Sequence, residues 1–211
     1  MHSTRERILA HLRRQPGQGV EALAGVIGLA PMTIRQHLDK MMADSLIEAQ
    51  TERRPIGRPA HVYFLTSQGE ERFPRAYDRL AELLLEELST VGERTQVSGV
   101  AVAGRREQLL QRIARRAADP HLKGLEGLGR TERWQAVTEI LRQESGFTEL
   151  EECGAGYELR EYNCVYQRVA ESHNDVCTFH TQYVSELVGQ VVELVSCKCS
   201  GADVCGFRPA L

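Results

Sequence analysis

Hydrophobic residues recur at helical spacing in three segments near the start of the chain, and turn residues separate these segments. Ser3-Thr4-Arg5-Glu6 has the sequence of a capping box, and the apolar positions after it predict a helix that ends at Pro16-Gly17. A second helix is expected over Val20–Ile27. Gly28-Leu29-Ala30 predicts a tight turn, after which a proline opens a third helix, Pro31–Asp44.

Strand-like patterns follow these helices. Leu46–Ala49 and His61–Leu65 are typical of short strands, and Gln50–Pro59 between them is a loop with three arginines and two prolines. The order helix, helix, helix, strand, basic loop, strand is typical of a winged helix-turn-helix, whose loop meets the DNA backbone or minor groove. We therefore predict a DNA-binding domain over residues 1–66.

Polar side chains lie on the outer face of the third predicted helix. Arg and Gln can bond bidentately to guanine and adenine, and Thr can contact a thymine methyl group or a phosphate. Arginines of the loop would contact phosphates and give salt-sensitive affinity. A solvated face is the alternative for the helix residues, but the strands and basic loop favour DNA. The candidate DNA-contacting residues are Thr33, Arg35, Gln36 and Lys40 in the helix and Arg53, Arg54 and Arg58 in the loop.

The middle of the chain, residues 67–146, has the pattern of amphipathic helices. Over Glu70–Thr90, leucines recur at intervals of three and four, so one side is apolar. This side either packs on the winged domain or pairs with a second copy. We favour a two-fold dimer, because one winged domain buries little surface on DNA. A helix over Arg105–Ala117 is expected to stop at Asp119-Pro120, and another covers Thr131–Glu144.

Strand patterns return in the last third. Thr148–Cys153 and Tyr157–Asn163 predict one hairpin, and Gln190–Cys199 and Val204–Arg208 predict a second. The segment between them, Val165–Val188, is mostly helical in pattern. The predicted fold class is α+β, comprising the winged helix-turn-helix of 1–66, a helical linker and dimerisation region over 67–146 and a cysteine-containing α+β sensor domain over 147–211.

Charge is distributed unevenly, although the net charge is only -3. Residues 1–65 carry nine Lys/Arg against six Asp/Glu, residues 66–146 carry thirteen of each, and residues 147–211 carry four against ten. A basic start and an acidic end indicate that only the first segment meets a polyanion. Apolar runs are too short to span a membrane and the chain opens without the apolar block of a signal peptide, so we expect a cytoplasmic protein.

The cysteines are confined to the last third of the chain. A reducing cytoplasm disfavours structural disulfides, so this grouping indicates metal or redox chemistry more than buried apolar cysteines, which would be scattered. Their wide spacing differs from the two-residue knuckles of zinc fingers, and ligands from a strand end, a helix and a hairpin fit a metal held between elements. Spacing alone leaves iron–sulfur and zinc open. The cysteines are Cys153, Cys164, Cys177, Cys197, Cys199 and Cys205.

Two passages carry a family resemblance. The first comprises Gly57–Thr66, Gly69, Phe73-Pro74 and Tyr77, and the second comprises Leu159–Cys164, Cys177 and Cys197–Cys205. They resemble the wing-to-linker and cluster-binding regions of the SufR family, which are repressors of iron–sulfur cluster assembly operons. The resemblance covers nearly the whole chain and is strongest in these passages. It implies an ArsR/DeoR-like winged helix, a homodimer and a [4Fe–4S] cluster in each subunit.

The resemblance also implies which residues hold that cluster. The ligands carried over by position are Cys164, Cys177, Cys205 and, as the leading fourth ligand, Cys197. Cys199 departs from the family pattern and could replace Cys197, because both would lie on one face of a strand. His180, one helical turn after Cys177, is a further candidate, although a histidine on a helix surface is more often solvated. Cys153 is expected to be an inert core residue.

The predicted function is a cluster-sensing repressor that binds operator DNA as a homodimer. Loss of the cluster, through iron scarcity or oxidation, would release the DNA. One alternative is a zinc- or thiol-based sensor on the same DNA-binding module. The other is an enzyme or small-molecule binding module that uses the acidic C-terminal domain. Because the sequence shows no paired catalytic carboxylates, nucleophile motif or phosphate loop, we expect no enzymatic activity.

Overall fold

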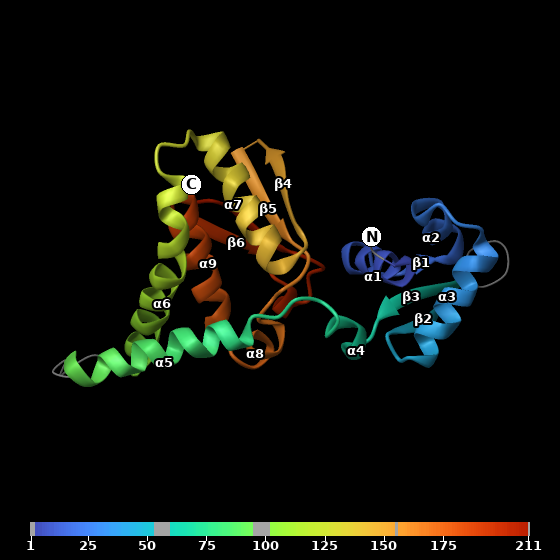
Figure 1. Cartoon of the computed structure of the whole chain (residues 1–211), viewed down its shortest axis with the longest axis horizontal. Coiled ribbons are helices and arrows are strands. Elements are labelled where there is room, and N and C mark those ends of the chain that lie inside the picture. Colours follow the sequence, from blue (N-terminus) through green and yellow to red (C-terminus); the bar gives the residue numbers. More distant parts are fainter. Residues whose placement is uncertain (1–2, 53–59, 95–101, 155, 211) are drawn as a thin grey trace. The chain divides into compact units, whose positions relative to one another are not determined.

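The N-terminal part of the chain follows the predicted order of helices and strands (Figure 1). The structure is a computed structural model that describes residues 3–52, 60–94, 102–154 and 156–210. The chain divides into two compact units, Met1–Phe73 and Pro74–Leu211. The elements of the first unit are α1 (Thr4–Arg14), β1 (Gln18–Gly19), α2 (Val20–Ile27), α3 (Pro31–Ala43), β2 (Ile47–Glu52), β3 (Ala60–Leu65) and α4 (Ser67–Glu70).

The sheet of the first unit has three antiparallel strands in the order β1-β3-β2. Sequence analysis missed β1, because a strand of two residues, Gln18 and Gly19, has no detectable period. The predicted capping box is present in α1. Ser3 Oγ accepts a hydrogen bond from the Glu6 N–H at 3.2 Å, and the Glu6 carboxylate accepts from the Ser3 N–H at 2.7 Å.

The core of the first unit lies between its helices and its sheet. Arg13 is buried there as well, because its guanidinium pairs with the Glu70 carboxylate and lies 5.3 Å from the centre of the Phe73 ring. These contacts attach the end of α1 to the segment that follows β3. The fully buried hydrophobic residues include Ile8, Leu12, Leu23, Ile34, Leu38 and Met41.

The second unit combines helices with a four-stranded antiparallel sheet of order β4-β5-β7-β6. Both predicted hairpins are confirmed, as β4–β5 and as β6–β7, and the α+β fold class is confirmed with them. The elements are α5 (Tyr77–Arg94), α6 (Val102–Leu125), α7 (Arg130–Ser145), β4 (Thr148–Cys153), β5 (Gly156–Glu161), α8 (Gln167–Ser172), α9 (Asp175–Val188), β6 (Val192–Ser196), the 3₁₀ turn η1 (Lys198–Ser200) and β7 (Cys205–Pro209).

One hydrophobic core serves the whole second unit. Helix α7 packs on β4, α9 packs on β6, and α6 packs along α9. Ile113 of α6, Trp134 of α7 and Tyr183 of α9 are buried in the same core as Leu159 and Phe207 of the sheet. Helices α5, α6 and α7, which lie in the region 67–146 that was predicted to be a linker and dimerisation region, therefore share their core with the cysteine-containing sheet.

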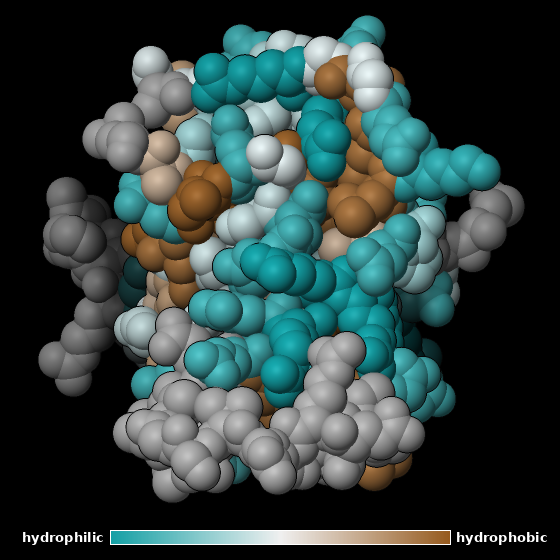
Figure 2. Space-filling view, turned by 90° about the vertical axis from the view of Figure 1, so that its left-hand side faces the viewer, coloured by the Kyte–Doolittle hydropathy of each residue, from teal (hydrophilic) through white to brown (hydrophobic). Residues whose placement is uncertain are grey.

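The apolar side of α5 is covered by α6 of the same chain. Leu80 and Leu83 enter the core beside Ile113, and Arg112 Nε lies 2.6 Å from a Glu87 carboxylate oxygen. The predicted packing of this side on the winged domain or on a second copy is therefore wrong for these residues. Leu85 of α5 remains 67% exposed. Figure 2 shows a face on which hydrophobic residues form separate patches among hydrophilic ones.

Three predicted helix limits differ in the structure. The helix predicted from Glu70 is interrupted: α4 ends at Glu70, Pro74 disfavours helical geometry in Phe73, and α5 begins only at Tyr77. Helix α6 continues through Pro120, and Arg79 Nη2 donates to the Ala117 carbonyl at 3.2 Å, one turn before that proline. The segment over 165–188 forms two helices, α8 and α9, instead of one. Among the described residues, no helix is long and apolar enough to cross a membrane.

Glu158 of β5 is expected to stabilise the second unit in a way that depends on pH. Burial raises its pKa, but hydrogen bonds from Arg160 and Arg208 outweigh burial and lower the pKa below the ordinary 4.5. Because folding lowers this pKa, ionised Glu158 stabilises the folded protein. The stabilisation is complete above pH 4.5 and is lost as the pH falls through the pKa of Glu158 in the folded protein. We expect Glu158→Gln to lower the urea midpoint at pH 7 and to converge with wild type at acid pH. Glu152→Gln, at an exposed position of β4, is the control and should match wild type throughout.

Candidate metal centre and nucleic-acid interface

Helices α2 and α3 form the predicted helix-turn-helix. Gly28, with φ of 75°, ends α2 in the left-handed region, where glycine avoids the steric cost of a side chain, and its N–H donates to the Ala24 carbonyl. Pro31 opens α3 after Ala30. The short turn therefore positions α3 as the second helix of the pair.

The outer face of α3 carries the predicted DNA-contacting residues. Arg35, Gln36 and Lys40 are exposed and Thr33 is half-buried, while the opposite face fills the core. Arg35 Nη2 lies 3.3 Å from a Glu21 carboxylate oxygen, and this exposed pair is weak enough for DNA to replace it. Sequence analysis missed another exposed residue, Met32, which is 62% exposed in the first turn of α3 and could contact a thymine methyl group.

Strands β2 and β3 support the predicted basic loop. They pair in register from Ile47 opposite Leu65 to Glu52 opposite Ala60, so the loop starts and ends at adjacent strand positions. The loop residues predicted to contact phosphate lie outside the described residues: Arg53, Arg54 and Arg58.

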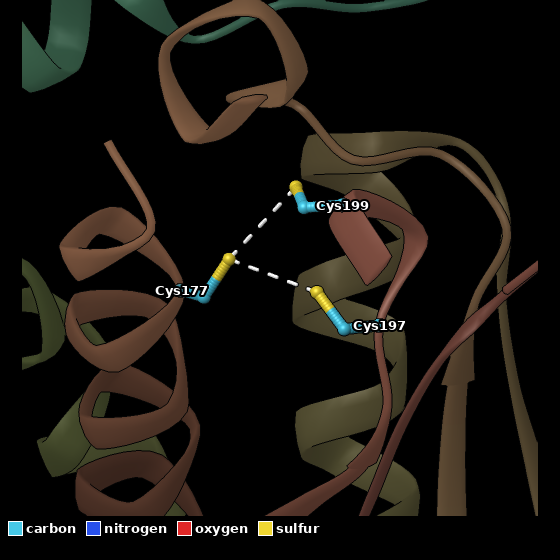
Figure 3. Close-up of side chains that lie close together, drawn as sticks. All are labelled: Cys177, Cys197 and Cys199. Carbon is cyan, nitrogen blue, oxygen red and sulfur yellow. Dashed lines mark hydrogen bonds between the residues drawn. The ribbon is translucent and has the colours of Figure 1, made fainter. Parts of the chain in front are cut away.

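Three cysteine sulfurs lie close together in the second unit (Figure 3). Cys177 projects from α9 towards Cys197, which directly follows β6, and towards Cys199 in η1. The Cys177 Sγ is 3.7 Å from Cys197 Sγ and 3.9 Å from Cys199 Sγ, and all three sulfurs lie within 4.8 Å of one another. Such a group of thiols is suited to a thiophilic metal ion or cluster.

The turn after β6 holds its two cysteines in place. The Ser200 and Ala202 N–H groups donate to the Cys197 carbonyl at 3.0 and 3.2 Å, and Gly201 closes the turn in the left-handed region with φ of 89°. The Lys198 N–H donates to Cys205 Sγ at 3.4 Å. Backbone N–H groups that face sulfur stabilise negative charge there, so this turn suits thiolate ligands.

A cavity beside the three thiols is lined by the four predicted ligands, although Cys164 and Cys205 are not in the group of three whose sulfurs lie within 4.8 Å of one another. It encloses about 20 Å³, and its apolar walls include Val165, Leu194 and Phe207. Cys199 is absent from the cavity lining but contacts Cys177 at its edge. Cys153 lines no part of this cavity and lies half-buried at the end of β4. The predicted ligands that line the cavity are Cys164, Cys177, Cys197 and Cys205.

His180 also lines this cavity, and its predicted solvation is wrong. Its side chain is only 12% exposed, because the face of α9 that carries it turns towards the sheet. The His180 Nε2 lies 2.6 Å from a Glu161 carboxylate oxygen, whereas Nδ1 is buried without a hydrogen-bond partner among the described residues. In many metal sites a histidine pairs with a carboxylate through one ring nitrogen and binds the metal through the other, and Nδ1 of His180 is available for that role.

The thiols differ in their readiness to ionise. Burial raises the pKa of Cys164 to about 12 and raises the pKa values of Cys177 and Cys205 as well. Burial acts on Cys197 in the same direction, but hydrogen bonds from the backbone N–H groups of η1 and from the thiols of Cys177 and Cys199 together outweigh it and lower the pKa of Cys197. A metal binds thiolates, so its binding at this site must release protons from the buried thiols.

Comparison with known proteins identifies the first unit. Residues 1–48 match the family model described as winged helix-turn-helix DNA-binding. No curated protein matches the chain. The match ends within β2, and the β2–β3 pair supplies the strands that flank a wing. The chain thus carries an N-terminal winged helix-turn-helix DNA-binding domain, followed by an α+β unit with a cysteine cluster.

Proposed function

We propose that the protein is a transcriptional repressor whose C-terminal unit holds an iron–sulfur cluster and controls DNA binding by the winged domain. The observation that carries this proposal is the convergence of five thiols from separate elements. Four line one cavity, and the fifth contacts Cys177 at the edge of it. The resemblance to SufR supports a [4Fe–4S] cluster and genes of iron–sulfur cluster assembly as targets. The proposal includes a homodimer and no enzymatic activity.

The donor set fits an iron–sulfur cluster. Thiolates are the usual ligands of such clusters, and hydrogen bonds to sulfur and an apolar surround set their stability and potential. This chain offers the N–H of Lys198 beside Cys205, apolar walls that limit water, and the Glu161–His180 pair at the same cavity. A bound cluster would supply a centre that iron supply and oxidants can alter. The residues that would hold it are Cys164, Cys177, Cys205 and Cys197, with Cys199 or His180 as the other candidates for the fourth position.

A single zinc ion is the second candidate, and one measurement favours it. Ligand sulfurs around a tetrahedral ion with metal–sulfur bonds of about 2.3 Å lie roughly 3.8 Å apart. The distances from Cys177 Sγ to Cys197 Sγ and Cys199 Sγ, 3.7 and 3.9 Å, match that value. In a [4Fe–4S] cluster each cysteine binds a different iron, so these sulfurs would have to separate. Both kinds of centre take four ligands, so the five nearby thiols fit either one, and the resemblance to SufR is what favours the cluster.

Control of DNA binding requires a difference in affinity between two arrangements of the chain. Occupancy can change DNA binding only if the DNA-competent arrangement holds the metal centre more tightly than the other arrangement does. The ligand residues come from the loop after β5, from α9, from the turn after β6 and from β7. Binding would therefore link these four parts of the second unit through the metal centre, and loss of the centre would remove that link.

The test is anaerobic purification of the full chain with assays for iron, acid-labile sulfide and zinc. The proposal expects a brown protein with iron and sulfide in equal amounts. A colourless protein with one zinc per chain would show that the site holds a zinc ion and not a cluster. Duplex DNA selected from a random library by the loaded protein is then used in gel-shift assays. The loaded protein should bind it more tightly than the chelator-stripped protein, and equal binding would contradict metal control.

Base recognition by α3 is tested with Arg35→Ala. If Arg35 bonds a guanine edge, the variant should lose about 1–3 kcal/mol on the selected sequence, which is roughly 5- to 150-fold in affinity. On random duplex the loss should be much smaller. Arg72→Ala, at an exposed position outside α3, is the matched control. It should change the affinity for both duplexes only slightly and to the same extent. Equal losses for Arg35→Ala on both duplexes would make Arg35 a phosphate contact.

A further inference from the structure

The thiols of the candidate metal centre are close enough for a second kind of chemistry. Cys177 Sγ and Cys197 Sγ lie 3.7 Å apart, and both residues are only partly buried. A disulfide bond is about 2.0 Å long, so the sulfurs need to approach by about 1.7 Å to form one. We propose that, in the metal-free protein, Cys177 and Cys197 are a site of reversible oxidation to an intramolecular disulfide.

The surroundings favour this pair over the other cysteines. Cys199 is slightly farther from Cys177, at 3.9 Å, and a bond between Cys197 and Cys199 would close a ring of only three residues. Cys205 is buried and already accepts the Lys198 N–H. The pair instead joins α9 to the end of β6, two elements that already pack against each other.

A peroxide is the oxidant that this step requires. The thiolate of one cysteine attacks the peroxide, so that an S–O bond forms, the O–O bond breaks and hydroxide leaves to take up a proton. The second thiol then attacks the sulfenic sulfur, which forms the S–S bond, breaks the S–O bond and releases water. With hydrogen peroxide, two thiols lose two electrons and two protons, and two water molecules result. A dithiol reductant reverses the bond by exchange.

The disulfide would weaken metal binding, because it removes two of the five thiols, and a disulfide sulfur is no longer a thiolate ligand. Oxidation of the empty site would thus keep its metal affinity low until thiols are restored. This consequence rests on the proposed function, whereas formation of the bond does not. The disulfide proposal and the proposed function can fail separately, because the disulfide is measured in protein that holds no metal.

The experiment treats the chelator-stripped full chain with hydrogen peroxide, blocks the remaining thiols by alkylation and digests with trypsin. Cleavage after Arg168 and Lys198 leaves Cys177 and Cys197 in one peptide, residues 169–198, and Cys199 in the next. The expected product is peptide 169–198 without alkyl groups and lighter by two hydrogen atoms. Alkylatable thiols should fall from six per chain to four, and a dithiol should restore six.

Variants and zinc binding complete the test. Cys177→Ser and Cys197→Ser should each prevent the internal bond, while the control Cys153→Ser should still form it. Zn²⁺ binding, measured against a chromophoric chelator, should fall at least tenfold in the oxidised wild-type chain and return after reduction. A cross-link between peptide 169–198 and the following peptide would overturn the assignment of Cys197. Six thiols still open to alkylation, or oxidation without a disulfide, would overturn the proposal.

Discussion

Replacing Cys177 by serine should have the largest effect of any single substitution on metal content. Cys177 Sγ is the sulfur that contacts both Cys197 Sγ and Cys199 Sγ, and Cys177 also lines the cavity with the other predicted ligands. Binding of a structural thiolate-held metal is worth about 10–16 kcal/mol, so loss of one of four ligands costs roughly 3 kcal/mol. We therefore expect about a 100-fold loss of metal affinity.

The measurement is Zn²⁺ or reconstituted iron and sulfide per chain, in protein purified under the same conditions as wild type. Cys153→Ser is the matched control, because Cys153 lies in the same unit, at the end of β4, but lines no part of the cavity. It should retain full metal content. The same assay on Cys197→Ser and Cys199→Ser identifies the fourth ligand, since only one of these two substitutions should match Cys177→Ser. Full loading of Cys177→Ser would contradict the metal centre described above.

The cysteine site was only partly predictable from the sequence. The resemblance implied four ligands, and these four cysteines line one cavity, but the three sulfurs that lie closest together are those of Cys177, Cys197 and Cys199. Cys197 and Cys199 were expected to lie on one side because they would alternate along a strand, but the structure brings them to one side in a different way. Strand β6 ends at Ser196, so Cys197 and Cys199 share a side through the η1 turn and not through strand alternation. A turn of three residues leaves no periodic signal, although the glycine at position 201 marks where the turn closes.

His180 illustrates a second limit of sequence analysis. Its helical position relative to Cys177 was evident, but its burial depends on Glu161 and Phe207, which come from other elements far along the chain. The same holds for α5, whose leucine pattern predicted an apolar side correctly. Only tertiary structure shows that α6 covers that side, with Arg112 and Glu87 paired across the two helices. Periodicity identifies a face to be buried, but it does not identify the partner.

The winged domain contains a glycine whose replacement should separate DNA binding from metal binding. A Cβ on Gly69 would lie 2.0 Å from the Leu46 carbonyl oxygen, closer than real contacts allow. That carbonyl accepts the Thr66 N–H at 3.1 Å, and Thr66 Oγ1 accepts the Gly69 N–H at 3.1 Å. Neither the Leu46 backbone nor the Gly69 backbone can move apart without loss of these hydrogen bonds. Overpacking of this kind costs about 3 kcal/mol or more, because backbone has to move.

We therefore expect Gly69→Ala to lower the melting temperature of the N-terminal unit by roughly 10–20 °C and to weaken DNA binding in proportion to the unfolded fraction. Metal content should stay at the wild-type level, since the cysteines lie in the other unit. Gly25→Ala is the matched control. Gly25 is exposed within α2 with nothing within 4 Å of its added Cβ, so alanine there should leave stability unchanged or raise it slightly. A normal melting temperature for Gly69→Ala would show that Leu46 and α4 do not approach as closely as described. A parallel loss of metal would show that the two units do not fold independently.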